Sequence, residues 1–173
     1  GMDETASTHV ELQLLSWLKT LLNYPQDSNG LLVSGGSMAN LVGLAVARTH
    51  ASNYDVRDEG VNLKDNSRLM FYGSVETHSC IRKAIELLGL GSKSLKLIPI
   101  NNDYTVNIDL LQKAIDEDRK NGYTPACIIA NVGTVNTGAI DPLIELSNIA
   151  KKENIWLHAD GAFGAITKFA KTS

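Results

Sequence analysis

Apolar and polar positions follow two periods along this chain, one typical of helices and one typical of buried strands. The apolar residues of 9–23 recur at three- and four-residue steps, which predicts an amphipathic helix that ends before Pro25. Short apolar runs predict strands at 30–33, 68–72, 94–100, 125–132 and 155–159. The polar stretch 51–67 predicts a surface loop or excursion.

Helical patterns separate these predicted strands. Helices are expected after the Ser-Gly-Gly-Ser turn at 34–37, over 81–88, from Asn107 to about Asn121, and from Asp141 to about Glu153. Asp141 is expected at the helix cap, with Pro142 in the first turn. Strands that alternate with helices indicate an α/β fold with a mainly parallel sheet between two helical layers.

Composition narrows the class of protein without naming a function. The chain has 173 residues and a formal net charge of -3, which argues against a nucleic-acid surface or attraction to an anionic membrane. Cys80 and Cys127 lack metal-ligand spacing, so no metal site is expected and both are predicted to be buried free thiols. We expect a cytoplasmic protein with an N-terminal amphipathic helix at 1–24 and one domain at 25–173.

Polar residues gather where predicted strands end and helices begin. In the 34–37 turn, Gly36 and Ser37 offer free N–H groups and a hydroxyl at a helix start, which suits a phosphate, although simple capping by Ser37 is an alternative. The turn lacks the spacing of nucleotide-binding loops. Three other predicted strands are followed by His78, Thr134 and Asp160. Each also has a purely local interpretation: His78 makes a local hydrogen bond, Thr134 belongs to a polar loop, and Asp160 opens a turn or caps a helix.

The carboxyl ends of parallel strands share one edge, so these groups are expected to lie together. A phosphate cradle, an imidazole, hydroxyls and a carboxylate suit pyridoxal phosphate. Asp160 would keep the pyridine nitrogen protonated, and the protonated ring would then accept electrons from the substrate Cα. His78 would stack on one face of the ring, and Ala162 would pack on the other.

The chain resembles the pyridoxal-phosphate-dependent amino acid decarboxylases, the group of aromatic amino acid, glutamate and histidine-type enzymes, from about Thr8 to Ala165. The motifs that carry the resemblance are Ser-Gly-Gly-Ser-Met-Ala-Asn at 34–40, Thr-His-Ser at 77–79, Asn-Val-Gly-Thr at 131–134, Thr-Gly-Ala-Ile-Asp-Pro at 137–142 and Trp-Leu-His-Ala-Asp-Gly-Ala-Phe-Gly at 156–164. The resemblance implies part of an aspartate-aminotransferase-like (fold type I) large domain and a homodimer with its active site at the interface.

The resemblance also assigns site residues by position. His78 and Asp160 match catalytic positions that also contact the cofactor, and further cofactor contacts match Gly36, Ser37, Thr134 and Ala162. Val135 stands where the family often has a second threonine.

The implied reaction converts an amino acid to an amine and carbon dioxide. The family's cofactor-bearing lysine lies farther from the aspartate than Lys168 or Lys171, in a His-Lys context that both lack. We therefore expect a fragment of the large domain that is inactive alone. Two alternatives stay open: another fold-type-I enzyme, such as an aminotransferase or carbon–carbon lyase, and a non-catalytic remnant that binds a phosphorylated ligand or serves in association.

Overall fold

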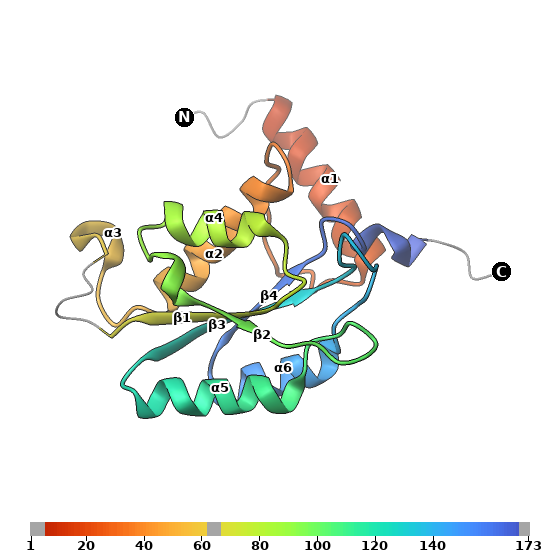
Figure 1. Cartoon of the computed structure of the whole chain (residues 1–173). Coiled ribbons are helices and arrows are strands. Elements are labelled where there is room, and N and C mark those ends of the chain that lie inside the picture. Colours follow the sequence, from red (N-terminus) through yellow and green to blue (C-terminus); the bar gives the residue numbers. More distant parts are fainter. Residues whose placement is uncertain (1–5, 62–66, 170–173) are drawn as a thin grey trace. The chain divides into compact units, whose positions relative to one another are not determined.

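The computed structural model describes residues 6–61 and 67–169, which form two compact units, Gly1–Gly35 and Gly36–Ser173 (Figure 1). The helices are α1 (Ala6–Leu22), α2 (Gly36–Ala51), α3 (Val56–Glu59), α4 (Ser79–Leu87), α5 (Ile108–Lys120) and α6 (Leu143–Glu153), with short 3₁₀ turns η2 (Ser92–Ser94) and η3 (Ala165–Phe169). The strands are β1 (Leu69–Ser74), β2 (Leu95–Ile98), β3 (Thr124–Asn131) and β4 (Trp156–Asp160).

The first unit is the helix α1 followed by an extended return segment. Lys19 Nζ donates to the carbonyls of Gln26 and Ser28 at 2.8 and 3.1 Å, which holds the turn after the helix. The predicted strand at 30–33 is wrong. The Leu32 N–H donates to Glu11 Oε1 at 2.7 Å and not to a sheet neighbour, so the segment forms no strand.

The second unit is built on a four-stranded sheet with strand order β2-β1-β3-β4, in which every pairing is parallel. Helices α2 and α4 cover one face, and α5 and α6 cover the other (Figure 1). The predicted α/β class with a mainly parallel sheet is therefore confirmed. None of the helices in the described part of the chain is both long and apolar enough to cross a membrane.

Alternation along the two central strands divides the core into two clusters. Phe71 and Cys127 face α2 and α4, whereas their neighbours Tyr72 and Ile128 face α5 and α6, and all four are essentially inaccessible to solvent. Fully burying an aliphatic or aromatic side chain of this size stabilises a fold by about 1.5–3 kcal/mol. Burial also raises the pKa of the Cys127 thiol well above its ordinary value, so the predicted buried free thiol stays protonated.

The structure adds a detail to one local expectation and corrects another. The 51–67 stretch contains the short helix α3, capped by Asp55, which accepts a hydrogen bond from the Arg57 N–H at 3.0 Å; residues 62–66 lie outside the described chain. Asp141 does not cap α6. Pro142 holds the cap position without a side-chain bond, because the Asp141 carboxylate is engaged elsewhere.

The register brings the strand ends to one edge. Ser74 at the end of β1 pairs with Ile98 at the end of β2, and Asn131 at the end of β3 pairs with Asp160 at the end of β4. The loops that follow β1, β3 and β4 therefore leave the sheet side by side, and they surround a pocket.

Candidate cofactor site

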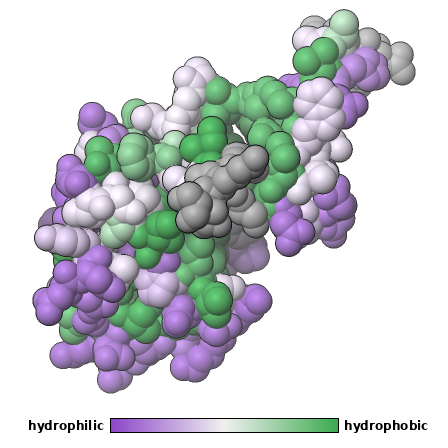
Figure 2. Space-filling model, turned by 90° about the vertical axis from the view of Figure 1, so that its right-hand side faces the viewer, coloured by the Kyte–Doolittle hydropathy of each residue, from purple (hydrophilic) through white to green (hydrophobic). Residues whose placement is uncertain are grey.

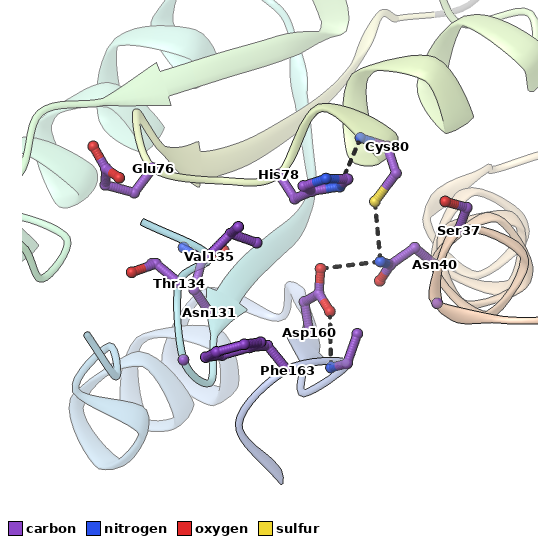
Figure 3. Close-up of a pocket in the computed structure, with 13 residues that line it drawn as sticks. Ser37, Asn40, Glu76, His78, Cys80, Asn131, Thr134, Val135, Asp160 and Phe163 are labelled. Atoms are coloured by element: carbon purple, nitrogen blue, oxygen red, sulfur yellow. Dashed lines mark hydrogen bonds between the residues drawn. The ribbon is translucent and has the colours of Figure 1, made fainter. Parts of the chain in front are cut away.

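A pocket of about 270 Å³ lies at the carboxyl ends of β1, β3 and β4, close to the lower end of the range for small-molecule sites. Every cofactor-binding residue predicted from the sequence lines it: Gly36, Ser37, His78, Thr134, Asp160 and Ala162. Figure 3 shows that Ser37 comes from α2, His78 from the start of α4 and Asp160 from the end of β4.

The start of α2 forms one wall of the pocket. The helix begins at Gly36, so Ser37 lies within the first turn and does not occupy the cap position that the capping alternative required. A Cβ at Gly36 would lie 3.0 Å from Cβ of Ala162, so glycine allows these two segments to approach each other. The unpaired N–H groups of a helix start, together with the Ser37 hydroxyl, suit a phosphate.

His78 makes the local hydrogen bond considered for it from the sequence, and it also lines the pocket. It caps α4, and its Nδ1 accepts a hydrogen bond from the Cys80 N–H at 3.2 Å. The local hydrogen bond fixes the orientation of an exposed ring that also lines the pocket. In the neutral ring, the proton is therefore on Nε2.

Asp160 is held at both carboxylate oxygens. Oδ1 accepts from the Ala162 N–H at 3.2 Å, and Oδ2 accepts from Nδ2 of Asn40 at 3.0 Å (Figure 3). Asn40 is 3% exposed, and sequence reasoning assigned it no role. The available signal was its place on α2 one helical turn after Gly36, which puts both residues on the same side of the helix.

The loop after β3 is held by its own hydroxyls. Thr134 is buried, its Oγ1 lies 2.6 Å from Oγ1 of Thr137, and it accepts from the Ala139 N–H at 3.2 Å. The Thr134 hydroxyl thus makes hydrogen bonds inside the loop, and Thr134 also lines the pocket. Val135 is exposed beside it and gives this wall an apolar surface.

A buried network of hydrogen bonds holds the strand ends that carry the pocket, and sequence reasoning missed it. Asn131 lines the pocket and donates from Nδ2 to Ser74 Oγ at 3.1 Å and to Asp141 Oδ2 at 2.9 Å. Asp141, which is 3% exposed, also accepts from the Asn131 N–H at 2.7 Å and the Val106 N–H at 2.8 Å. The network joins the ends of β1 and β3 to the segment before α5.

The donor set fits pyridoxal phosphate, the cofactor expected from the sequence. The start of α2 suits its phosphate, and the half-buried carboxylate of Asp160 suits a protonated ring nitrogen, because an adjacent opposite charge favours the charged form. None of the described residues lining this pocket is a lysine, so these residues would hold the cofactor without a covalent bond. The Lys168 side chain and Lys171 lie outside the described part of the chain. Among the described residues no cluster of metal ligands occurs.

Comparison with known proteins identifies the family of this chain. Residues 3–172 match the model of the pyridoxal-dependent decarboxylase conserved domain. An aromatic-L-amino-acid decarboxylase of Bacillus atrophaeus is 40% identical over 156 residues, which cover 90% of this chain and 30% of that protein.

Solved structures share the fold. The glutamate decarboxylase domain of a diaminobutyrate-pyruvate transaminase and L-2,4-diaminobutyrate decarboxylase from Vibrio parahaemolyticus has a TM-score of 0.89 at 29% identity, over 97% of this chain and 38% of its own. Oryza sativa TDC with PLP and tryptamine has a TM-score of 0.77 at 30% identity, over 89% of this chain and 33% of its own. The chain spans about a third of the length of the relatives it matches. It belongs to the pyridoxal-dependent decarboxylase family, whose cofactor is pyridoxal phosphate.

Proposed function

We propose that this chain is the cofactor-holding part of an enzyme that decarboxylates an amino acid to an amine and carbon dioxide. The observation that carries the proposal is the meeting of His78, Asp160 and the start of α2 around one pocket, in a chain of this family. The cofactor, when bound, supplies a protonated ring that accepts the electron pair left at the substrate Cα.

In this proposal each of five residues that line the pocket has one task. The Asp160 carboxylate holds a proton on the ring nitrogen, and the N–H groups at Gly36 and Ser37 bind the phosphate. His78 lies against one face of the ring, and Ala162 lies against the other. The aromatic-L-amino-acid decarboxylase relative makes aromatic L-amino acids the first substrates to test.

Binding by the 173-residue chain is tested with pyridoxamine 5′-phosphate, which has no aldehyde and so does not react with surface lysines. Calorimetric titration should show one saturable site, and Asp160→Asn should weaken it about tenfold, equal to about 1.4 kcal/mol. Asp116→Asn, at an exposed position on α5, is the matched control and should bind like the wild type. Absent binding, or equal affinity in Asp160→Asn, would refute the proposed site.

The reaction is tested on the protein encoded by the source gene, supplied with pyridoxal phosphate and carboxyl-labelled L-amino acids. Release of labelled carbon dioxide with an equal amount of amine is expected. A keto acid product would indicate an aminotransferase, and cleavage of the side chain would indicate a carbon–carbon lyase. Failure of every amino acid to react would favour the non-catalytic remnant.

We further propose that the protein acts as a homodimer. In support, none of the α1 residues is buried, and Val10 and Trp17 on this helix are 68% and 58% exposed. Figure 2 shows hydrophobic areas among hydrophilic ones on one face of the molecule. Sedimentation velocity of the source-gene protein should show a dimer, and a monomer at micromolar concentration would refute this part of the proposal.

A further inference from the structure

Two side chains that the sequence analysis did not assign to the site are linked to the Asp160 carboxylate by hydrogen bonds. Asn40 on α2 uses both hydrogens of its amide, one toward Asp160 Oδ2 at 3.0 Å and one toward Cys80 Sγ at 3.3 Å. Its Oδ1 lies 2.6 Å from Nε2 of His158, a residue of β4. A hydrogen-bonded series therefore runs from His158 through Asn40 to Asp160.

The Asp160 carboxylate fixes which groups donate and which accept along this series. A carboxylate only accepts hydrogen bonds, so the NH₂ group of Asn40 has to face Asp160. The Asn40 carbonyl then faces His158, whose Nε2 has to donate. If the amide were turned over, its oxygen would face the acceptor-only carboxylate, so the Asp160 end selects the orientation and thereby the His158 tautomer.

The fold makes room for this arrangement. His158 and Asp160 stand two residues apart on β4 and thus on the same face of the sheet, toward α2. Gly43 lies three residues after Asn40 on α2, and a Cβ there would lie 2.7 Å from Cε1 and 2.8 Å from Nδ1 of His158. A glycine inside a helix lowers helix stability, and here it leaves the space that the imidazole ring occupies.

The protonation of His158 agrees with its place in the series. Burial lowers the pKa of His158, an effect that the nearby Asp160 charge partly opposes. The neutral ring carries one proton, and the contact with Asn40 places it on Nε2.

We propose that Asn40 and His158 are positioning residues, which hold the Asp160 carboxylate toward the ring nitrogen of the cofactor; this inference rests on the proposed function. With Asn40 on one oxygen and the Ala162 N–H on the other, the carboxylate cannot rotate freely, and its remaining lone pairs stay directed to the pocket. Asn40 lines the cofactor pocket and His158 does not, so His158 acts on the carboxylate through Asn40.

The test uses the 173-residue chain with pyridoxamine 5′-phosphate labelled with ¹⁵N in the ring. Asn40→Ala and His158→Phe should each weaken binding about tenfold. Both should also move the titration of the bound ring nitrogen, read from its ¹⁵N shift, to lower pH. His158→Gln, which keeps a donor near the Nε2 position, should retain the affinity and the ¹⁵N titration of the wild type. Asn148→Ala, at an exposed position on α6, is the matched control.

The outcomes separate this inference from the proposed function. A wild-type chain that does not bind the probe overturns both. Wild-type binding with unchanged affinity and ¹⁵N titration in Asn40→Ala and His158→Phe overturns the positioning role alone. If circular dichroism shows that Asn40→Ala is unfolded, the two His158 variants decide. A His158→Gln variant as impaired as His158→Phe would mean that the ring acts by packing and not by donating, which also overturns the proposal.

Discussion

The substitution Asp141→Asn tests the network that supports the pocket. The Asp141 carboxylate is 3% exposed and accepts three hydrogen bonds, from the Val106 N–H at Oδ1 and from the Asn131 N–H and Nδ2 at Oδ2. Asparagine has almost the same shape, but it has one acceptor oxygen and a donor in place of the other. The substitution therefore changes hydrogen bonding and charge without opening a cavity.

The magnitude follows from the bonds that remain. If the asparagine oxygen keeps both contacts with Asn131, its NH₂ faces the buried Val106 N–H, which costs about 1–3 kcal/mol as an unsatisfied donor. The two remaining bonds lose their charge assistance, roughly 1 kcal/mol each. Removing a buried charge returns part of this by relieving desolvation. We expect Asp141→Asn to lower the free energy of unfolding by about 2–4 kcal/mol, a large part of the roughly 5–15 kcal/mol typical of domains.

Urea unfolding of the chain, followed by circular dichroism, measures this loss. Asp116→Asn is the matched control, since Asp116 is exposed on α5 and accepts only from Gln112 among the hydrogen bonds described, so its effect should stay within about 0.5 kcal/mol. A loss below about 1 kcal/mol in Asp141→Asn would refute the reasoning, because it would mean that the three bonds do not hold the loops together.

Three further predictions concern other parts of the second unit. Burial lowers the pKa of His158 below its ordinary 6.5, so the unfolded state binds the proton more readily; the free energy of unfolding should fall as the pH drops below 6.5, and a glutamine there should remove that part of the pH dependence. Gly164→Ala should destabilise the chain to urea by about 1–3 kcal/mol, since its Cβ would lie 2.1 Å from the Val132 carbonyl oxygen, and an unchanged midpoint would contradict this. Tyr72→Phe should cost about 1.5–3 kcal/mol in the same assay, because the buried Tyr72 hydroxyl donates to the Asp118 carboxylate at 2.9 Å. A cost near zero would mean that this bond only balances the desolvation of its partners.

Much of the second unit could be predicted from local signals. The apolar run at 125–132 gave β3, which is buried on both faces as a central parallel strand should be. Asn107 caps α5 through a bond from the Leu110 N–H, and Gly122, with a φ of 78°, follows its end. These features depend on residues within a few positions of each other, which is why the sequence alone specifies them.

The errors arise where a distant residue competes for the same group. An Asp-Pro pair at a helix start favours capping, but Asp141 binds the Val106 N–H, which lies 35 positions earlier in the chain. Apolar residues at 30–33 favour a strand, but Leu32 donates to Glu11 on α1, 21 positions earlier. Neither partner can be read from the local pattern, because the contact exists only once the chain has folded.

Two carboxylates near the same edge of the sheet differ in the number of hydrogen-bond donors that surround them. Asp141 is buried, and its oxygens receive three N–H donors from the protein, so it has little capacity left for a ligand. Asp160 is partly exposed in the pocket, and each of its oxygens receives a single donor, from Ala162 and from Asn40. Its negative charge is thus oriented but not saturated, and a cationic ring nitrogen is the group that would complete it. The sequence shows an aspartate at both places, and the number of donors around each one separates Asp141, which is saturated and supports the pocket, from Asp160, which keeps acceptor positions open in it.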